Sequence, residues 1–373
     1  MFKQRLNELR LTLRLTPAGP LLVKAGEDPA ALLAAEAGTR SMAADFDQLY
    51  QRARHNISYR EERIRALRDE SKLERARQTG DERALREKLD LDMRFVATRR
   101  PGKPDPEVYL PGSGLKGVLR SRAEQLTRTL LPHVPVCDIF AEDQPATGLR
   151  SCTKTVPEKD SRVVPPVERY ARACRICQLF GCGGLAGRLS VSDAYLLPEP
   201  KPMFGTRSGV GIDRYRGAAA SGALFFYQVL ERGMFEFTLT LENFELWQAG
   251  LLAFALHDLL HGELPIGYGA RRGLGRVRGE AQTAWLTYFG IEPHTAGAGC
   301  ALLGVARLTA DPSLAGTYGW APEPDAPPVL AGARLQTVGL RQEWALGQED
   351  LEALWAAGAA AWRKLPSREE AHP

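Results

Sequence analysis

The sequence predicts an α+β fold in which two strand–helix–strand units build one sheet. Residues 9–15 alternate leucine with Arg and Thr, and residues 234–241 alternate Phe and Leu with Glu and Thr. A period of two is typical of strands with one buried face. After each of these strands the chain continues with a predicted helix and then another strand, so both units have the same order of elements.

In the first unit, a glycine-rich turn at 110–114 opens a helix predicted over 115–131, and residues 187–194 return to a strand pattern. In the second unit, Asn243 can cap an apolar helix over 245–261, after which a basic glycine-rich loop, 267–278, runs into the closing strand. Two such units pack as the split β-α-β arrangement of ferredoxin-like and RNA-recognition folds.

The composition is that of a globular protein. The chain has 373 residues, of which 44% are hydrophobic and 25% charged. No apolar run approaches the roughly 20 residues of a membrane span, and the N-terminus alternates polar with apolar residues where a signal peptide would be continuously apolar. We therefore expect a cytoplasmic protein without a membrane partner. The net charge, 49 − 45 = +4, permits nucleic-acid binding but does not require it.

Three segments fall outside the strand–helix pattern. Residues 45–91 are highly charged with a thin apolar stripe, which predicts a solvated helical insertion; its many arginines leave open a contact with nucleic acid or a neighbouring subunit. Residues 132–184 have little periodicity, and residues 281–373 form a predicted C-terminal subregion or extension. The predicted core comprises residues 1–44 and 92–280.

Five of the six cysteines lie in 132–184 and predict a zinc-finger-like insertion. Cys174 and Cys177 form a Cys-x-x-Cys half-site, whose spacing lets two thiolates bind one tetrahedral ion. In a reducing cytosol such a cluster indicates structural zinc before disulfides. The alternative is a metal-free insertion packed with small buried cysteines. The best further ligands, followed by the rival and a weaker candidate, are Cys137, Cys152, Cys182 and His133.

Three glycine-rich basic segments predict contacts with a polyanion. Free backbone N–H groups at the start of the helix over 115–131, with basic side chains one turn apart, suit an anion. The segment 204–216 predicts an extended loop or hairpin projecting from the sheet, and the loop 267–278 is also basic. The alternative is that these glycines only let the loops turn. The candidate residues are Gly112, Ser113, Gly114, Lys116, Arg120, Arg207, Arg214, Arg216, Arg271 and Arg272.

The sequence resembles the RAMP superfamily (repeat-associated mysterious proteins) of CRISPR systems, specifically the backbone subunits of type III effector complexes. The resemblance covers residues 1–44 and about 92–280, and it implies a ferredoxin-like or RRM-like RAMP core. The motifs that carry it occur in the family's order. They are residues 110–120, 177–181, 186–189, 193–194, 209–214 and 267–277.

The resemblance implies that copies of this subunit stack along a guide RNA and hold its backbone, while a thumb-like hairpin from each copy enters between the guide and its target. Residues 111–120 and 267–278 would bind guide phosphates, and residues 204–216 would form the thumb. The implied partners are CRISPR guide RNA, complementary target RNA and other effector subunits, including copies of this chain.

Catalytic members of the family are similar in placing an aspartate on a loop before a short extended segment and the turn at 111–113. By this resemblance Asp92 takes that position. A carboxylate beside a scissile phosphate can hold Mg²⁺ or Mn²⁺ or help to activate the ribose 2′-hydroxyl. Because Arg94 and Thr98 depart from the family pattern and a long insertion precedes Asp92, the rivals Asp90 and Asp28 remain open.

The leading hypothesis is a guide-RNA-binding backbone subunit that is also a metal-dependent endoribonuclease acting on guide-paired target RNA. One alternative is a non-catalytic structural backbone subunit. Another is a guide-RNA-processing ribonuclease, which would need a general base such as a histidine near the first helix. His55 and His133 fit that role poorly.

Overall fold

The structure is a computed structural model, and it describes residues 4–24, 95–102, 106–139, 151–159, 162–290, 294–339 and 341–366. The predicted helical insertion over 45–91 lies outside these ranges. So do the three candidate catalytic residues, Asp28, Asp90 and Asp92.

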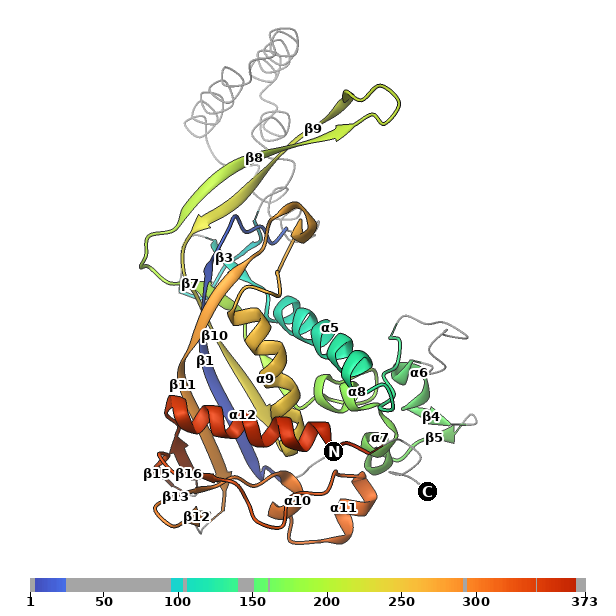
Figure 1. Cartoon of the computed structure of the whole chain (residues 1–373), viewed down its shortest axis with the longest axis vertical. Coiled ribbons are helices and arrows are strands. Elements are labelled where there is room, and N and C mark those ends of the chain that lie inside the picture. The colour runs from blue at the N-terminus through green and yellow to red at the C-terminus, as the bar shows by residue number, and fades with distance from the viewer. Residues whose placement is uncertain are drawn as a thin grey trace.

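An antiparallel sheet forms the body of the protein (Figure 1). Its strands follow the order β15-β16-β11-β1-β10-β7-β3-β2, and β6 also pairs with β10. The strands are β1 (Asn7–Pro17), β2 (Ala97–Thr98), β3 (Glu107–Leu110), β6 (Leu189–Val191), β7 (Ala194–Leu196), β10 (Phe235–Glu242), β11 (Val277–Phe289), β15 (Arg334–Val338) and β16 (Arg341–Ala345).

The two alternating segments of the sequence are adjacent strands of this sheet. Leu11 of β1 lies opposite Leu239 of β10, and both side chains are buried with the other apolar residues of the two strands. β11 pairs with the other edge of β1. The order β11-β1-β10-β6 therefore places the fourth, first, third and second strands of two split β-α-β units side by side. The predicted α+β fold is confirmed.

Two helices cover one face of the sheet (Figure 1). They are α5 (Gly112–Leu130) and α9 (Leu246–Leu260), and an ion pair between Arg122 and Asp258 joins them. α9 begins with a capping box in which Glu245 is the N-cap. The prediction that Asn243 caps this helix is wrong, because the Asn243 amide bonds instead to the backbone of residues 4 and 6.

The basic segment 204–216 belongs to a hairpin that projects from the sheet (Figure 1). Its strands are β8 (Met203–Ile212) and β9 (Ala219–Arg232). At the turn, Asp213 Oδ1 accepts hydrogen bonds from the backbone N–H groups of Tyr215 and Arg216. This Asx-type turn uses a short acidic side chain to reverse the chain, which explains an aspartate among the arginines.

The cysteine-bearing insertion is built from short elements, consistent with its lack of periodicity. They are α6 (Cys152–Thr155), β4 (Glu158–Lys159), β5 (Arg162–Val163), α7 (Pro166–Arg172) and α8 (Arg175–Phe180). The insertion is anchored to the core because the Tyr170 hydroxyl donates a 2.6 Å hydrogen bond to the buried carboxylate of Glu245.

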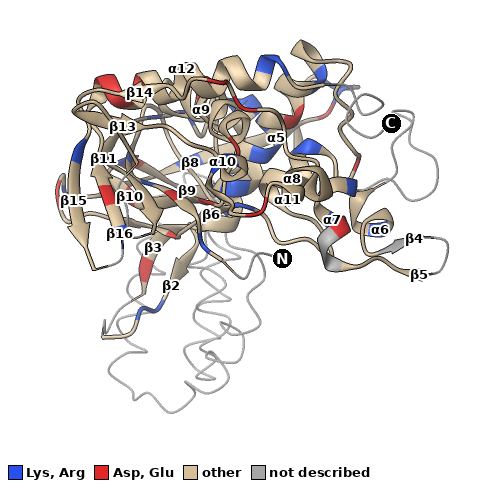
Figure 2. Cartoon of the chain, turned by 90° about the horizontal axis from the view of Figure 1, so that it is seen from below, with Lys and Arg blue, Asp and Glu red and all other residues tan. Residues whose placement is uncertain are grey.

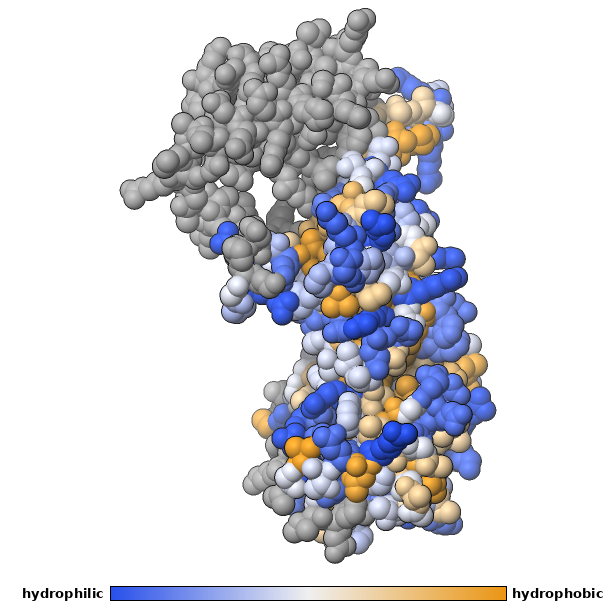
Figure 3. Space-filling view, turned by 90° about the vertical axis from the view of Figure 1, so that its left-hand side faces the viewer, coloured by the Kyte–Doolittle hydropathy of each residue, from blue (hydrophilic) through white to orange (hydrophobic). Residues whose placement is uncertain are grey.

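The residues after 280 extend the same sheet. β11 continues to Phe289, and β16 pairs with it, followed by β15. The remaining elements are β12 (Thr295–Ala296), β13 (Gly299–Ala301), α10 (Val305–Leu308), α11 (Ser313–Tyr318), β14 (Val329–Leu330) and α12 (Gln348–Arg363). Acidic and basic residues are interspersed over the body (Figure 2), and much of the face seen in Figure 3 is hydrophilic. None of the described helices is long and apolar enough to cross a bilayer.

α9 and α12 meet backbone to backbone at a pair of glycines. A Cβ added to Gly250 would lie 2.1 Å from the carbonyl carbon of Gly358, and one added to Gly358 would lie 2.5 Å from Gly250 N. Real Cβ atoms do not approach backbone this closely, so these two positions set the distance between the helices.

We therefore expect Gly250→Ala to destabilise the protein by about 1–3 kcal/mol, because the two helices must separate to admit the methyl group. Thermal or urea denaturation measures this change. Gly316→Ala is the matched control, since Gly316 is also helical and no atom lies within 4 Å of its Cβ position. Equal stability of the two variants would contradict the prediction.

Candidate nucleic-acid interface and metal centre

The glycine-rich loop and the β8–β9 hairpin share one root, the segment of residues 18–24 that follows β1. The segment after β1 bonds to both, because Leu21 and Leu230 exchange backbone hydrogen bonds of 3.0 and 2.8 Å, and the N–H of Tyr268 donates to Leu22 O at 2.7 Å. The Arg272 guanidinium also lies 5.8 Å from the ring centroid of Phe225 in β9. Two of the three predicted basic segments therefore lie side by side.

The loop needs its glycines. Gly267, Gly269, Gly273 and Gly275 all have positive φ, and between them the chain forms one turn of 3₁₀ helix, η1 (Ala270–Arg272). A Cβ on Gly275 would lie 2.1 Å from Ile266 O, and one on Gly267 would lie 2.3 Å from Leu22 O. The resulting tight turn leaves Arg271 and Arg272 exposed beside the hairpin.

The hairpin carries exposed basic and aromatic side chains. Tyr215, at the turn, is 97% exposed and lies between Arg214 and Arg216 in the sequence. Arg207 forms a 3.4 Å ion pair with Glu231, whereas Arg214 and Arg216 make no ion pair within the described ranges. An exposed aromatic ring flanked by cations suits a polyanion that also carries flat bases.

The predicted anion site at the start of α5 is already partly filled. The N–H of Gly112 donates to Asp193 Oδ1 at 2.7 Å, and a Cβ there would lie 2.3 Å from Val191 O. Ser113 and Gly114 are exposed. Lys116 is half-buried, and burial together with the charge of Arg120 lowers its pKa. The surface offered to an anion at this end of α5 is therefore Ser113, Gly114 and Lys116.

Arg120 faces the cysteine-bearing insertion. Its guanidinium donates to the Glu124 carboxylate at 3.0 Å, to Gly181 O at 2.8 Å and to Cys177 Sγ at 3.2 Å. These partners outweigh burial and raise its pKa, with Cys177 and Glu124 as the causes. Arg120 thus links α5 to a cysteine, a contact that its place in the sequence motif does not indicate.

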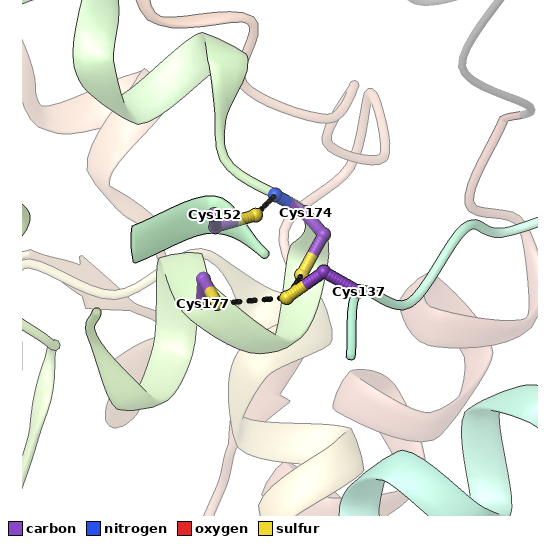
Figure 4. A group of neighbouring side chains, drawn as sticks. All are labelled: Cys137, Cys152, Cys174 and Cys177. Carbon is purple, nitrogen blue, oxygen red and sulfur yellow. Dashed lines mark hydrogen bonds between the residues drawn. The ribbon is translucent and has the colours of Figure 1, made fainter. Parts of the chain in front are cut away.

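Four cysteines meet in the insertion, and they are the four predicted from the sequence (Figure 4). Cys137, Cys152, Cys174 and Cys177 are buried, and all four Sγ atoms lie within 4.8 Å of one another. Cys137 Sγ lies 3.6 Å from the Sγ atoms of both Cys174 and Cys177. A tetrahedral ion with Zn–S bonds of about 2.3 Å separates its sulfurs by about 3.8 Å. The donor set and spacing fit a metal such as zinc.

The electrostatics of the four thiols also suit a cation. Hydrogen bonding with Cys137 raises the pKa of the Cys152 and Cys177 thiols, while hydrogen bonds from Cys137 and Cys152 hold the pKa of Cys174 well below its usual range. So many thiols at this distance cannot all ionise unaided. A bound dication would let all four act as thiolate ligands.

The two other ligand candidates lie outside this cluster. Cys182 is half-buried next to Cys177, but it is not among the four sulfurs that share one site. His133 Nε2 hydrogen-bonds Leu365 O at 3.0 Å, which ties it to the C-terminal segment instead. Within the described ranges, the four cysteines are the one group that could hold a metal ion.

Comparison with known families identifies the central part of the chain. Residues 93–278 match the family model of the RAMP superfamily. The chain contains a RAMP superfamily domain. This RAMP domain spans the cysteine-bearing insertion, the hairpin and the glycine-rich loop through to the start of β11, while β1 completes its sheet from outside the matched residues.

Other comparisons add little. No curated protein matches the sequence. Among solved structures, one similar chain belongs to a "Type IV-B CRISPR Complex"; it is 15% identical, with 73% of this chain and 90% of that chain covered and a TM-score of 0.39. That similarity is too low to assign a function.

We predict about one zinc ion per chain, because four thiolates at these distances complete a tetrahedral shell. Elemental analysis of protein purified without chelators measures the ratio. Cys177→Ser should remove most of the metal, whereas Cys182→Ser, at the neighbouring half-buried thiol, should leave it. Loss of zinc from Cys182→Ser with retention in Cys152→Ser would show that the fourth ligand is Cys182.

Proposed function

We propose that this chain is a guide-RNA-binding backbone subunit of a CRISPR effector complex of type III, and that it cuts guide-paired target RNA with a metal ion. One observation carries the RNA-binding part: the arginine-bearing hairpin and the arginine-bearing loop share a root on a RAMP domain. The partners proposed with it are the guide RNA, complementary target RNA and other effector subunits, copies of this chain among them.

The charges on this surface support binding to a nucleic-acid backbone. Arg214, Arg216 and Arg271 are exposed and form no ion pair within the described ranges, so a phosphate can approach them without displacing a carboxylate. Glycines on either side keep the backbone accessible. Contacts of this kind position a strand and do not read its sequence, which suits a subunit whose specificity comes from guide pairing.

The sequence predicts that Lys116 and Arg120 both bind phosphate, but in the structure Arg120 contacts Cys177. We expect Lys116→Ala to weaken RNA binding without regard to sequence, and to flatten the log–log salt dependence by roughly 0.7 for each single-strand phosphate that the variant no longer binds. Arg120→Ala should keep that slope but speed the release of zinc to a chelator, because it removes the guanidinium that donates to Cys177. Fluorescence anisotropy at several salt concentrations and a chromogenic chelator assay give the two readouts.

The Arg122→Ala variant is the control for both assays, since Arg122 lies on the same helix and pairs with Asp258 away from the cysteines. A lower salt slope in Arg120→Ala with unchanged zinc release would show that Arg120 binds an RNA phosphate and does not support the cysteine site.

The proposed nuclease centre rests on the family resemblance. Asp92 and its rivals lie outside the described residues, and the described residues hold no carboxylate cluster that could bind a catalytic metal. Cleavage would therefore depend on one of three carboxylates, Asp92, Asp90 or Asp28. It would hold Mg²⁺ or Mn²⁺ beside the scissile phosphate or help to activate the 2′-hydroxyl. Without such a carboxylate the chain is a structural backbone subunit.

Asp92→Ala should abolish Mg²⁺- or Mn²⁺-dependent cutting of guide-paired RNA while leaving assembly and target binding unchanged, because a carboxylate used only for chemistry can be removed without touching the groups that bind phosphate. Gel assays of the assembled complex measure cutting and binding on the same RNA. Asp90→Ala and Asp28→Ala are the controls for the family alignment: if one of them stops cutting and Asp92→Ala does not, another aspartate takes the catalytic position. A wild-type complex that binds a matched RNA but never cuts it would favour the non-catalytic subunit.

A further inference from the structure

A polar pocket lies where the end of β1, the end of α9 and the start of β11 meet. Its volume is about 400 Å³, within the range of small-ligand sites. The residues that line it include Thr16, Ala18, His261, Gly262, Arg276 and Arg278. None of the lining residues is acidic, so the pocket presents two guanidinium groups with no carboxylate among its walls.

Both arginines are available to a ligand. Arg276 and Arg278 are exposed, and neither makes a side-chain ion pair or hydrogen bond with another described residue. Arg14, by contrast, is paired with Glu236 a short distance along β1. Two unpaired guanidinium groups in one concavity form a site for an anion with several oxygens, and a phosphate matches their forked donors.

Hydrogen bonds fix the main chain at both arginines. The N–H of Ala18 donates to Arg276 O at 2.9 Å, and Thr16 Oγ1 donates to Arg278 O at 3.2 Å. Gly262 has φ of +82°, and a Cβ there would lie 3.1 Å from Val277 O and 3.9 Å from Arg278 Cγ. A side chain at this position would crowd the wall of the pocket beside Arg278.

His261 adds a hydrogen-bond acceptor. Its Nδ1 lies 2.8 Å from His257 O, and a carbonyl can only accept, so Nδ1 carries the proton. In the neutral ring Nε2 then keeps a lone pair and accepts a hydrogen bond from a hydroxyl. A phosphate beside a hydroxyl is the pairing that the ribose 2′-OH gives to RNA and not to DNA.

We propose that this pocket binds one ribonucleotide unit of an RNA strand, with its phosphate on Arg276 and Arg278 and its 2′-hydroxyl donating to His261. The proposal rests on the proposed RNA-binding function. It deepens the proposed role of the glycine-rich loop by assigning its last two arginines, together with His261 from the end of α9, to one concave site, and it gives the surface a means of preferring RNA to DNA.

The test compares binding of a single-stranded RNA and a DNA of the same sequence to the full chain. The double variant Arg276→Ala/Arg278→Ala should weaken RNA binding at least tenfold and lower the salt slope by about 0.7, the value for the one single-strand phosphate that the two arginines share. The charge-matched control is Arg334→Ala/Arg363→Ala, which removes two exposed arginines that make no ion pair within the described ranges. It should change affinity and slope far less. His261→Ala should reduce the preference for RNA over DNA and leave the slope unchanged.

Two failures are distinguishable. If wild-type protein binds RNA and the pocket variant matches its charge-matched control, this site is overturned while RNA binding stands. If wild-type protein binds no RNA, the proposed function fails. If the wild-type protein then binds a free ribonucleoside 5′-monophosphate and the pocket variant does not, the pocket is a site for free nucleotides. That result would overturn the proposal that it binds a unit of an RNA strand.

Discussion

The short segment that follows β1 fixes the end of the molecule proposed to bind RNA. β1 is hydrogen-bonded on both edges, to β10 and to β11, so its direction is set by the sheet. Residues 18–24 continue from it and bond in turn to three other pieces of chain: to β9 at Leu21, to the glycine-rich loop at Pro20 and Leu22, and to residues 95–96 at Val23. The hairpin and the loop are therefore both positioned by backbone hydrogen bonds to the segment that continues β1.

The same end shows why glycine and arginine occur together there. The loop must pass close to other backbone, and at Gly267 and Gly275 a Cβ would overlap a carbonyl oxygen. The buried apolar side chains at this end, Leu21, Leu22, Leu230, Ile266 and Leu274, pack beneath the loop, while Arg271 and Arg272 remain exposed. The exposed side chains of the loop are not constrained by packing and can be arginine, as an electrostatic contact with phosphates requires.

Periodic segments are predictable from the sequence, whereas contacts between distant segments are not. The alternation in β1 and β10 reflects burial on one face, which is a local property, and both strands lie where it places them. The four cysteines are recognisable because two of them have the spacing of a chelating half-site. The sequence assigns Arg120 to phosphate because its neighbours are glycines and Lys116, but its partners Gly181 and Cys177 come from another element. Residue type alone favours Asn243 as a cap, while the capping box of Glu245 and Gln248 also depends on Tyr170 and Ala321.

The cysteine-bearing insertion and the core helices form one connected structure. Arg120 ties the cysteines to α5, which also carries Lys116 one turn before Arg120. On the other side of the insertion, the buried carboxylate of Glu245 accepts hydrogen bonds from the Tyr170 hydroxyl and from Ala321 N. This one carboxylate therefore connects the insertion, α9 and the C-terminal segment. Burial and this carboxylate raise the pKa of Tyr170 well above its usual range, so the hydroxyl keeps its proton and remains a donor. Loosening the cysteines would thus release the contact to Arg120 of α5, whereas the contact of the insertion to α9 runs through Tyr170 and does not involve a cysteine.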